Sequence, residues 1–91
     1  MNDMPDAQEG KLPMERQAWM DRIAIDSAIH HGEPCIKHTR IPVSMIVGSI
    51  ADGDTFEEIL AAYPALSVDD IQAALHYAAE AVRDAPLLPL A

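Results

Sequence analysis

His30-His31-Gly32-Glu33-Pro34-Cys35-Ile36-Lys37-His38-Thr39-Arg40-Ile41-Pro42-Val43-Ser44 is the stretch that decides the fold. Pro34 and Pro42 fix their own φ and push the residues before them towards extended backbone, which argues against a continuous helix here. Gly32 can turn the chain ahead of Pro34, because glycine tolerates positive φ. Between the prolines a weak period of two predicts a short strand or hairpin arm, which enters a helix at Pro42 or Ser44.

Two helices are expected directly after this stretch. The first covers residues 43–52, where apolar side chains recur at i, i+3, i+4 and i+7, and Gly53 is placed to end it in a left-handed conformation. The second begins at Asp54 or Thr55, each of which has a glutamate three positions later, as in a capping box. Pro64 ends this second helix.

A third, longer helix is expected after Ser67, which is a suitable N-cap. Asp69 and Asp70 follow in the first turn, where the helix dipole favours anions. One apolar stripe then continues through the helix: Ile71, Ala74, Leu75, Ala78, Ala79 and Val82. Two short helices followed by a longer one are similar to a helix-turn-helix layout.

The segments outside these helices complete the expected architecture. Residues 1–18 are predicted to be a disordered tail, because prolines and a glycine stand among polar residues. A first strand is expected over 19–25, with Trp19 in the core, and 85–91 forms a flexible apolar tail. The fold class is therefore mainly α: a helix-turn-helix-like bundle of three helices with a short N-terminal β-strand or hairpin, in a single domain over 19–84.

The length of the chain predicts that it associates. A single core in a chain of 91 residues supplies only roughly 3–5 kcal/mol, so small domains need further support. Cys35 is the only cysteine and cannot form an internal disulfide. We therefore expect a homodimer.

The sequence also bears on compartment and on partners. A lone cysteine suits a reducing compartment, and residues 1–10 carry no apolar run of the kind found in a signal peptide. No stretch approaches the ~20 apolar residues of a membrane span, so we expect a cytoplasmic protein. The net charge is −9, and residues 52–91 carry eight acidic residues against Arg83 alone, a net charge of −7. Electrostatically, this half of the chain is better suited to binding a basic protein than to binding the phosphate backbone of a nucleic acid.

Five sequence elements, in their order and spacing over residues 23–79, resemble the domain of unknown function 433 family. They are Gly32-x-Pro34-x-Ile36-x-x-Thr39-Arg40-Ile41-Pro42-Val43, Ala51-Asp52-Gly53, Glu57-Glu58-Ile59-Leu60, Tyr63-Pro64-x-Leu66-x-x-Asp69-Asp70-Ile71 and Ala73-Ala74-Leu75-x-Tyr77-Ala78. The resemblance implies a helix-turn-helix-type protein of the kind found as antitoxin in type II toxin–antitoxin pairs. Such a protein binds a small nuclease-like toxin, with its own operator DNA as a further candidate partner.

The chain departs from the family pattern at two places. Where the family usually has Gly-Gly-Lys-Pro, this chain has Glu33 in place of the lysine, which weakens any phosphate contact there. Where the family has Gly-Thr-Arg, this chain has His38 in place of the glycine. Histidine adopts positive φ more readily than most residues, so the turn is expected to survive.

DNA contact is one hypothesis for the basic loop. In a helix-turn-helix protein the start of the second motif helix enters the major groove, but here that start carries Asp69 and Asp70. The alternative is that Arg40 pairs with a carboxylate such as Asp26 or Asp52 and holds the strand to the first helix. The candidate nucleic-acid-binding residues are Lys37, His38, Thr39 and Arg40.

Metal binding and catalysis are weaker hypotheses. The ligand types His30, His31, Cys35 and His38 lie within nine residues but lack a zinc-finger spacing, so no metal site is predicted. Cys35 and His38 form no complete nucleophile constellation, and Cys35 is expected as a small buried residue. The acidic pairs Glu57–Glu58 and Asp69–Asp70 are expected as caps and solvated surface. We predict no enzyme and no cofactor.

One face of the third helix is a candidate partner surface. It lies opposite the apolar stripe and carries His76, Tyr77, Glu80 and Arg83. We expect an antitoxin-like protein that binds a basic toxin; the alternative is a stand-alone transcriptional regulator that binds operator DNA through the loop at residues 37–40.

Overall fold

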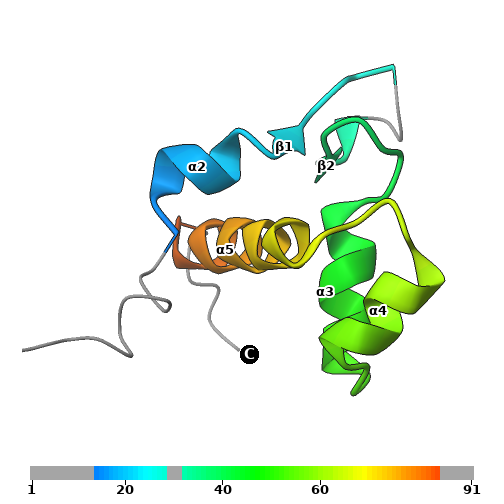
Figure 1. Cartoon of the computed structure of the whole chain (residues 1–91). Helices are drawn as coiled ribbons and strands as arrows, with labels where there is room; N and C mark the ends of the chain where they lie inside the picture. Colours follow the sequence, from blue (N-terminus) through cyan, green and yellow to red (C-terminus); the bar gives the residue numbers. More distant parts are fainter. Residues whose placement is uncertain (1–13, 29–31, 85–91) are drawn as a thin grey trace, which may run out of the picture.

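The computed structural model describes residues 14–28 and 32–84, which form four helices and two short strands (Figure 1). In chain order they are α2 (Arg16–Met20), β1 (Ile23–Ala24), β2 (Cys35–Ile36), α3 (Val43–Ala51), α4 (Phe56–Ala62) and α5 (Val68–Asp84). The expected fold class, a mainly helical domain with a short β-hairpin, is confirmed; α2 adds a fourth helix to the three that were expected.

The hairpin is shorter than the predicted strand. β1 pairs antiparallel with β2, with Ile23 opposite Ile36 and Ala24 opposite Cys35. The predicted strand over 19–25 is therefore wrong in its first half, because residues 16–20 form α2. The helix turns Trp19 onto α5, where its side chain is only 5% exposed. A strand at residue 19 would also need a partner that the two-residue β2 does not supply.

The boundary of the N-terminal tail moves for the same reason. The predicted tail extends to residue 18, but residues 16–18 belong to α2. Residues 1–13 and the predicted tail at 85–91 lie outside the described residues, so those two predictions stay untested.

The segment between the prolines carries the chain from β2 into α3. Gly32 has φ of 84° and His38 has φ of 68°, so both adopt the left-handed backbone that the sequence predicts for them. The Val43 amide donates to the Pro34 carbonyl at 2.9 Å, which fixes the entry into the helix. The N-cap of α3 is Pro42 and not the alternative, Ser44.

Local capping sets the limits of the remaining helices. Gly53, with φ of 99°, follows the end of α3 as predicted. Thr55 caps α4 through a capping box with Glu58, which settles the choice between the two predicted caps. At the start of α5, the Asp70 amide donates to Ser67 Oγ at 3.2 Å, and the Ser67 amide donates to Asp70 Oδ2 at 3.0 Å.

The core lies where α5 crosses α3, with α4 and β2 closing its sides. Its buried members are Ile36, Val43, Ile46, Ile59, Leu66, Ile71 and Ala74. Helix α2 packs on another face of α5 (Figure 1). Among the described helices, none combines the length and the hydropathy needed to cross a membrane.

Candidate functional site

The basic loop at residues 37–40 is a turn closed by hydrogen bonds. The Ile36 amide donates to the Ile41 carbonyl at 3.0 Å, and the Thr39 amide donates back to the Ile36 carbonyl at 3.0 Å. The Thr39 hydroxyl donates to the same Ile36 carbonyl at 2.7 Å and accepts from the Ile41 amide at 3.0 Å. The half-buried side chain of Thr39 therefore stabilises the backbone of the turn through these hydrogen bonds.

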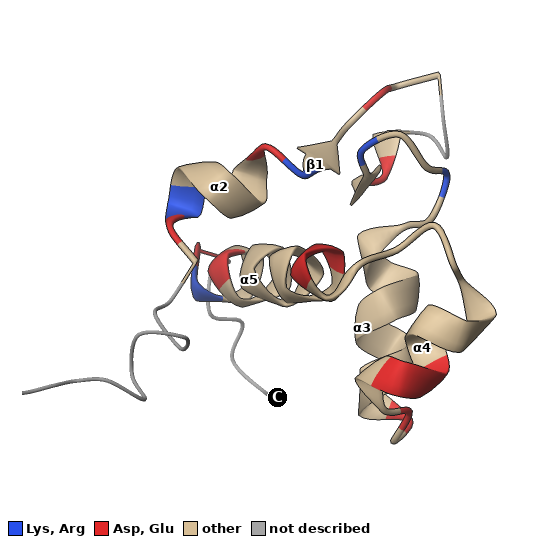
Figure 2. Cartoon of the chain, viewed as in Figure 1, with Lys and Arg blue, Asp and Glu red and all other residues tan. Residues whose placement is uncertain are grey.

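The other three candidate residues of this turn project from it. Lys37, His38 and Arg40 are exposed, and His38 stands at the tip with its left-handed backbone. The Lys37 amide donates to the Arg22 carbonyl at 2.8 Å and so extends the hairpin by one bond. Figure 2 shows the basic residues on the loop after β2 and acidic residues around the start of α4, at opposite ends of α3.

A carboxylate pair at the start of α5 is engaged by the hairpin. Arg22 Nη1 lies 3.0 Å from Asp70 Oδ1, and Arg22 Nη2 lies 3.4 Å from Asp69 Oδ2. Asp70 caps α5 as expected but is only 8% exposed, so the expectation of solvated surface is wrong for Asp70. The spacing Ser67-x-x-Asp70 is the sequence signal for the capping role of Asp70. The ion pair with Arg22 has no such signal, because Arg22 is distant in the sequence.

The candidate partner face of α5 is partly covered by the chain's own α2. The Trp19 ring stacks on His76 with centroids 5.9 Å apart and planes 9° apart, and meets Tyr77 edge-on at 6.4 Å. Of the four predicted residues, His76 and Tyr77 thus contact α2 through Trp19 and Glu80 contacts it through an ion pair, whereas Arg83 is exposed.

The ion pair between Arg16 and Glu80 fastens the other side of α2. Arg16 Nε donates to both Glu80 oxygens at 2.8 Å, and Arg16 Nη2 lies 2.6 Å from Glu80 Oε2. This hydrogen bonding holds the pKa of Glu80 below its ordinary value and raises the pKa of Arg16 above its own. The pair joins α2 to the C-terminal half of α5.

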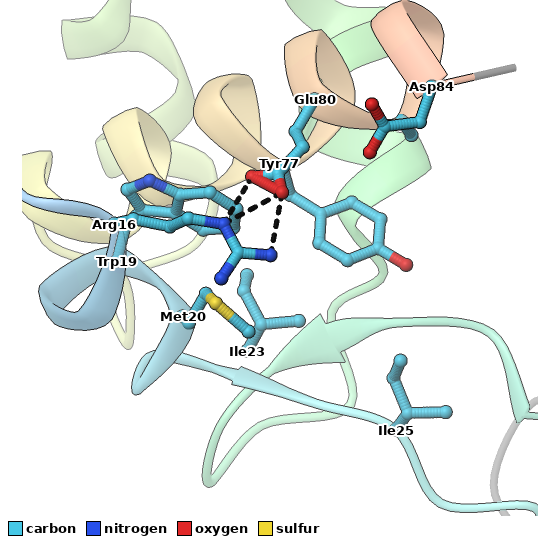
Figure 3. Close-up of a pocket in the computed structure, with 9 residues that line it drawn as sticks. Arg16, Trp19, Met20, Ile23, Ile25, Tyr77, Glu80 and Asp84 are labelled. Carbon is cyan, nitrogen blue, oxygen red and sulfur yellow. Dashed lines mark hydrogen bonds and ion pairs between the residues drawn. The ribbon is translucent and has the colours of Figure 1, made fainter.

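Open grooves flank that half of α5, and two of them have mainly apolar linings. The first, called the α2–α5 groove, has a volume of about 370 Å³ and runs between Met20 and Ile23 on one side and Tyr77 on the other, with the Arg16–Glu80 pair at its rim (Figure 3). The second, called the α3–α5 groove, has a volume of about 460 Å³ and runs between Val47 and Gly48 of α3 and Ala78 and Val82 of α5. Tyr77 lines both grooves.

Cys35 is a buried residue of the domain interior and not a reactive surface thiol. Its side chain is 4% exposed and its thiol lies 3.5 Å from the Glu33 carbonyl. Burial, with a smaller contribution from the charge of Glu33, raises the pKa of the Cys35 thiol. Within residues 14–28 and 32–84, no three His, Cys, Asp or Glu side chains are grouped to hold a metal ion; His30 and His31 lie outside this part of the chain.

The fold and these surfaces define a small domain in which a short β-hairpin precedes the helices α3, α4 and α5. A sequence profile of a family of proteins of unknown function, DUF433, matches residues 23–78. The chain therefore belongs to the DUF433 family.

A solved structure supports the same assignment. The chain is similar to a DUF433 member protein from Anabaena variabilis ATCC 29413, whose crystal structure was determined at 2.00 Å resolution. The sequence identity is 30%, the TM-score is 0.66, and the match covers 88% of this chain and 79% of that one. Comparison with curated proteins gave no match.

Proposed function

We propose that this protein is an antitoxin-like binding module that acts in the cytoplasm as a homodimer and neutralises a small, basic toxin protein. The observation that carries the proposal is the open apolar surface on the C-terminal half of α5 in a strongly acidic chain. Val82 is 75% exposed there, next to two grooves.

The chemistry of this surface suits a protein partner. Contiguous exposed apolar side chains mark interaction sites on small soluble domains. Residues 52–91 carry a net charge of −7, so approach of a basic protein is favoured and approach of another polyanion is opposed. Tyr77, which lines both grooves, and Arg83, which is exposed, are the predicted partner residues best placed for such a contact.

Co-expression with the product of the adjacent reading frame tests the proposal. We expect the two proteins to co-purify, and expression of the neighbour alone to arrest growth that this chain restores. Val82→Glu should weaken the complex at least tenfold, whereas the matched variant Ala61→Glu, on the exposed side of α4, should not. A neighbour that neither arrests growth nor co-purifies would contradict the proposal.

A second candidate function rests on the basic turn. Lys37, His38 and Arg40 are exposed on a turn that hydrogen bonds hold in one shape, away from the acids of α4 (Figure 2). A homodimer would present this turn twice to operator DNA. Gel shifts on the sequence upstream of the gene, repeated at several salt concentrations, test this function.

The gel shifts have distinct expected outcomes. If the turn binds DNA, Lys37→Ala should weaken binding and reduce the dependence of log K on log[salt] by about one unit, because one phosphate contact is lost. Asp54→Ala, at the acidic end, should not reduce either quantity. Equal binding by wild type and Lys37→Ala would exclude this turn as the DNA contact.

A further inference from the structure

The apolar stripe of α5 extends past the core of the domain. At its start, Ile71 and Ala74 are fully buried against α3. Further along, Ala78 is half-buried and Val82 is 75% exposed, although both continue the same stripe. An apolar helix face is ordinarily buried against another element. The end of this face, at Val82, is therefore left uncovered by the described residues of the chain.

Gly48 is an independent sign that something packs against the α3–α5 groove. It lies in the middle of α3, where glycine is among the poorest helix formers. A Cβ built at Gly48 would meet no atom within 4 Å, so no close approach within the described chain requires a glycine there. Gly48 lines the groove, and a glycine allows another backbone to approach closely.

One end of the groove carries a charge. Glu33, which also lines it, accepts a hydrogen bond from the Ser44 hydroxyl at the first turn of α3. The rest of the lining is apolar or small, including Val43, Val47 and Ala81. The groove thus has a carboxylate at one end and a largely apolar lining that includes Gly48.

We propose that the α3–α5 groove binds an amphipathic α-helix of a basic partner protein, with the apolar face of that helix over Gly48 and a lysine or arginine of the helix paired with Glu33. This inference rests on the proposed function and names the surface that the partner uses. Charge complementarity selects this occupant, because the chain carries a net charge of −9 and a second copy would bring the same charge to the interface.

The test uses the full chain labelled with ¹⁵N and two synthetic helical peptides. Both peptides carry the same leucine and alanine face; one carries lysines on its polar face and the other carries glutamates. We expect the lysine peptide to shift the amide signals of residues 43–48 and 77–82, and the glutamate peptide to bind at least tenfold more weakly. Shifts confined to other residues, or none at all, would overturn the inference.

Gly48→Leu separates docking from folding. Because a Cβ at this position meets no atom within 4 Å and leucine favours helix more than glycine does, the melting temperature should be unchanged or higher. The affinity for the lysine peptide should nevertheless fall at least tenfold. Gly48→Ala, with one added methyl group, is the second variant and should weaken binding less; Ala61→Leu on α4 is the control and should leave affinity unchanged. Equal affinities for wild type and Gly48→Leu would refute the groove as the site.

Three further outcomes test the inference. Glu33→Lys should reverse the preference between the lysine and glutamate peptides. If Gly48→Leu instead converts a wild-type dimer to a monomer in sedimentation experiments while neither peptide binds, the occupant is a second copy and the inference is overturned. A neighbour-encoded protein that co-purifies equally with wild type and Gly48→Leu would leave the proposed function intact and exclude only this groove.

Discussion

Arg22 and Asp70, 48 residues apart in the chain, form an ion pair of 3.0 Å that closes the hairpin onto the first turn of α5. Each of the two residues also makes local hydrogen bonds. The Arg22 carbonyl accepts the Lys37 amide of the basic turn, and Asp70 caps α5 together with Ser67. One contact therefore links the basic turn, the hairpin and the longest helix.

The two aspartates of this site should differ sharply in their effect on stability. Asp70→Ala removes the cap bond to the Ser67 amide and the pair with Arg22 from a site that is 8% exposed. We expect the free energy of unfolding to fall by about 1–3 kcal/mol. Asp69, whose side chain is 56% exposed, is the control, and Asp69→Ala should change stability by less than about 0.5 kcal/mol. Urea denaturation of both variants measures the difference, and equal losses would contradict this assignment.

The hydroxyl of Thr39 should contribute to the stability of the turn and not to ligand binding. Thr39→Val removes a hydroxyl that makes two hydrogen bonds, to the Ile36 carbonyl and from the Ile41 amide. Unfolding free energy should fall by about 1–2 kcal/mol. Thr39→Ser keeps the hydroxyl and should lose much less. Denaturant midpoints compare them; a serine variant as unstable as the valine variant would show that the hydroxyl is not what matters.

His38→Gly should stabilise the protein. His38 has φ of 68°, a backbone region that glycine enters without a Cβ clash. The expected gain in unfolding free energy is about 1 kcal/mol. His38→Val should have the opposite effect, because a β-branched side chain is poorly accommodated at positive φ. Thermal melts of the three proteins test the order, and a glycine variant less stable than wild type would count against a strained turn.

The Arg16–Glu80 pair should make stability depend on acid pH. The pKa of Glu80 is lowered in the folded state from its ordinary value of 4.5, chiefly by the hydrogen bond from Arg16. The stabilising contribution is therefore fully present above pH 4.5 and is lost as pH falls through the lower folded pKa. Wild type should be more stable than Glu80→Gln at pH 7, and the two should converge as pH falls through the lowered folded-state pKa of Glu80. A difference that stays constant across this range would exclude the linkage.

Cys35 should be unreactive until the protein unfolds. Its thiol is 4% exposed, and burial raises its pKa, so little thiolate forms at pH 8. A colourimetric disulfide reagent should label native protein slowly, and label protein in denaturant at the rate of a free thiol. Rapid labelling of the native protein would contradict the buried position.

Local signals explain why much of the fold was predictable. Gly53, Thr55 and Ser67 set helix limits through backbone conformation and caps, which involve only residues a few positions apart. Pro34 and Pro42 likewise restrict their own neighbours. The family resemblance includes Pro34, Pro42 and Gly53 among its positions, and the profile match over residues 23–78 confirms it.

The N-terminal segment shows where local signals fail. Trp19, Ile23 and Ile25 share the alternation of a strand, but only Ile23 pairs in β1, and Ile25 is 61% exposed. Residues 16–20 form a helix because α5 offers Trp19 a place beside His76 and gives Arg16 a partner in Glu80. Neither partner can be identified from a pattern within five residues.

The sequence by itself determined the hairpin stretch, the three C-terminal helices and the positive φ at His38, since each follows from the chemistry of neighbouring residues. Only the tertiary structure decided that Arg22 pairs with Asp70, that α2 covers His76 and Glu80, and that Val82 and Gly48 border one open groove. These contacts join residues far apart in the chain, and they depend on how the helices cross, which no local pattern specifies.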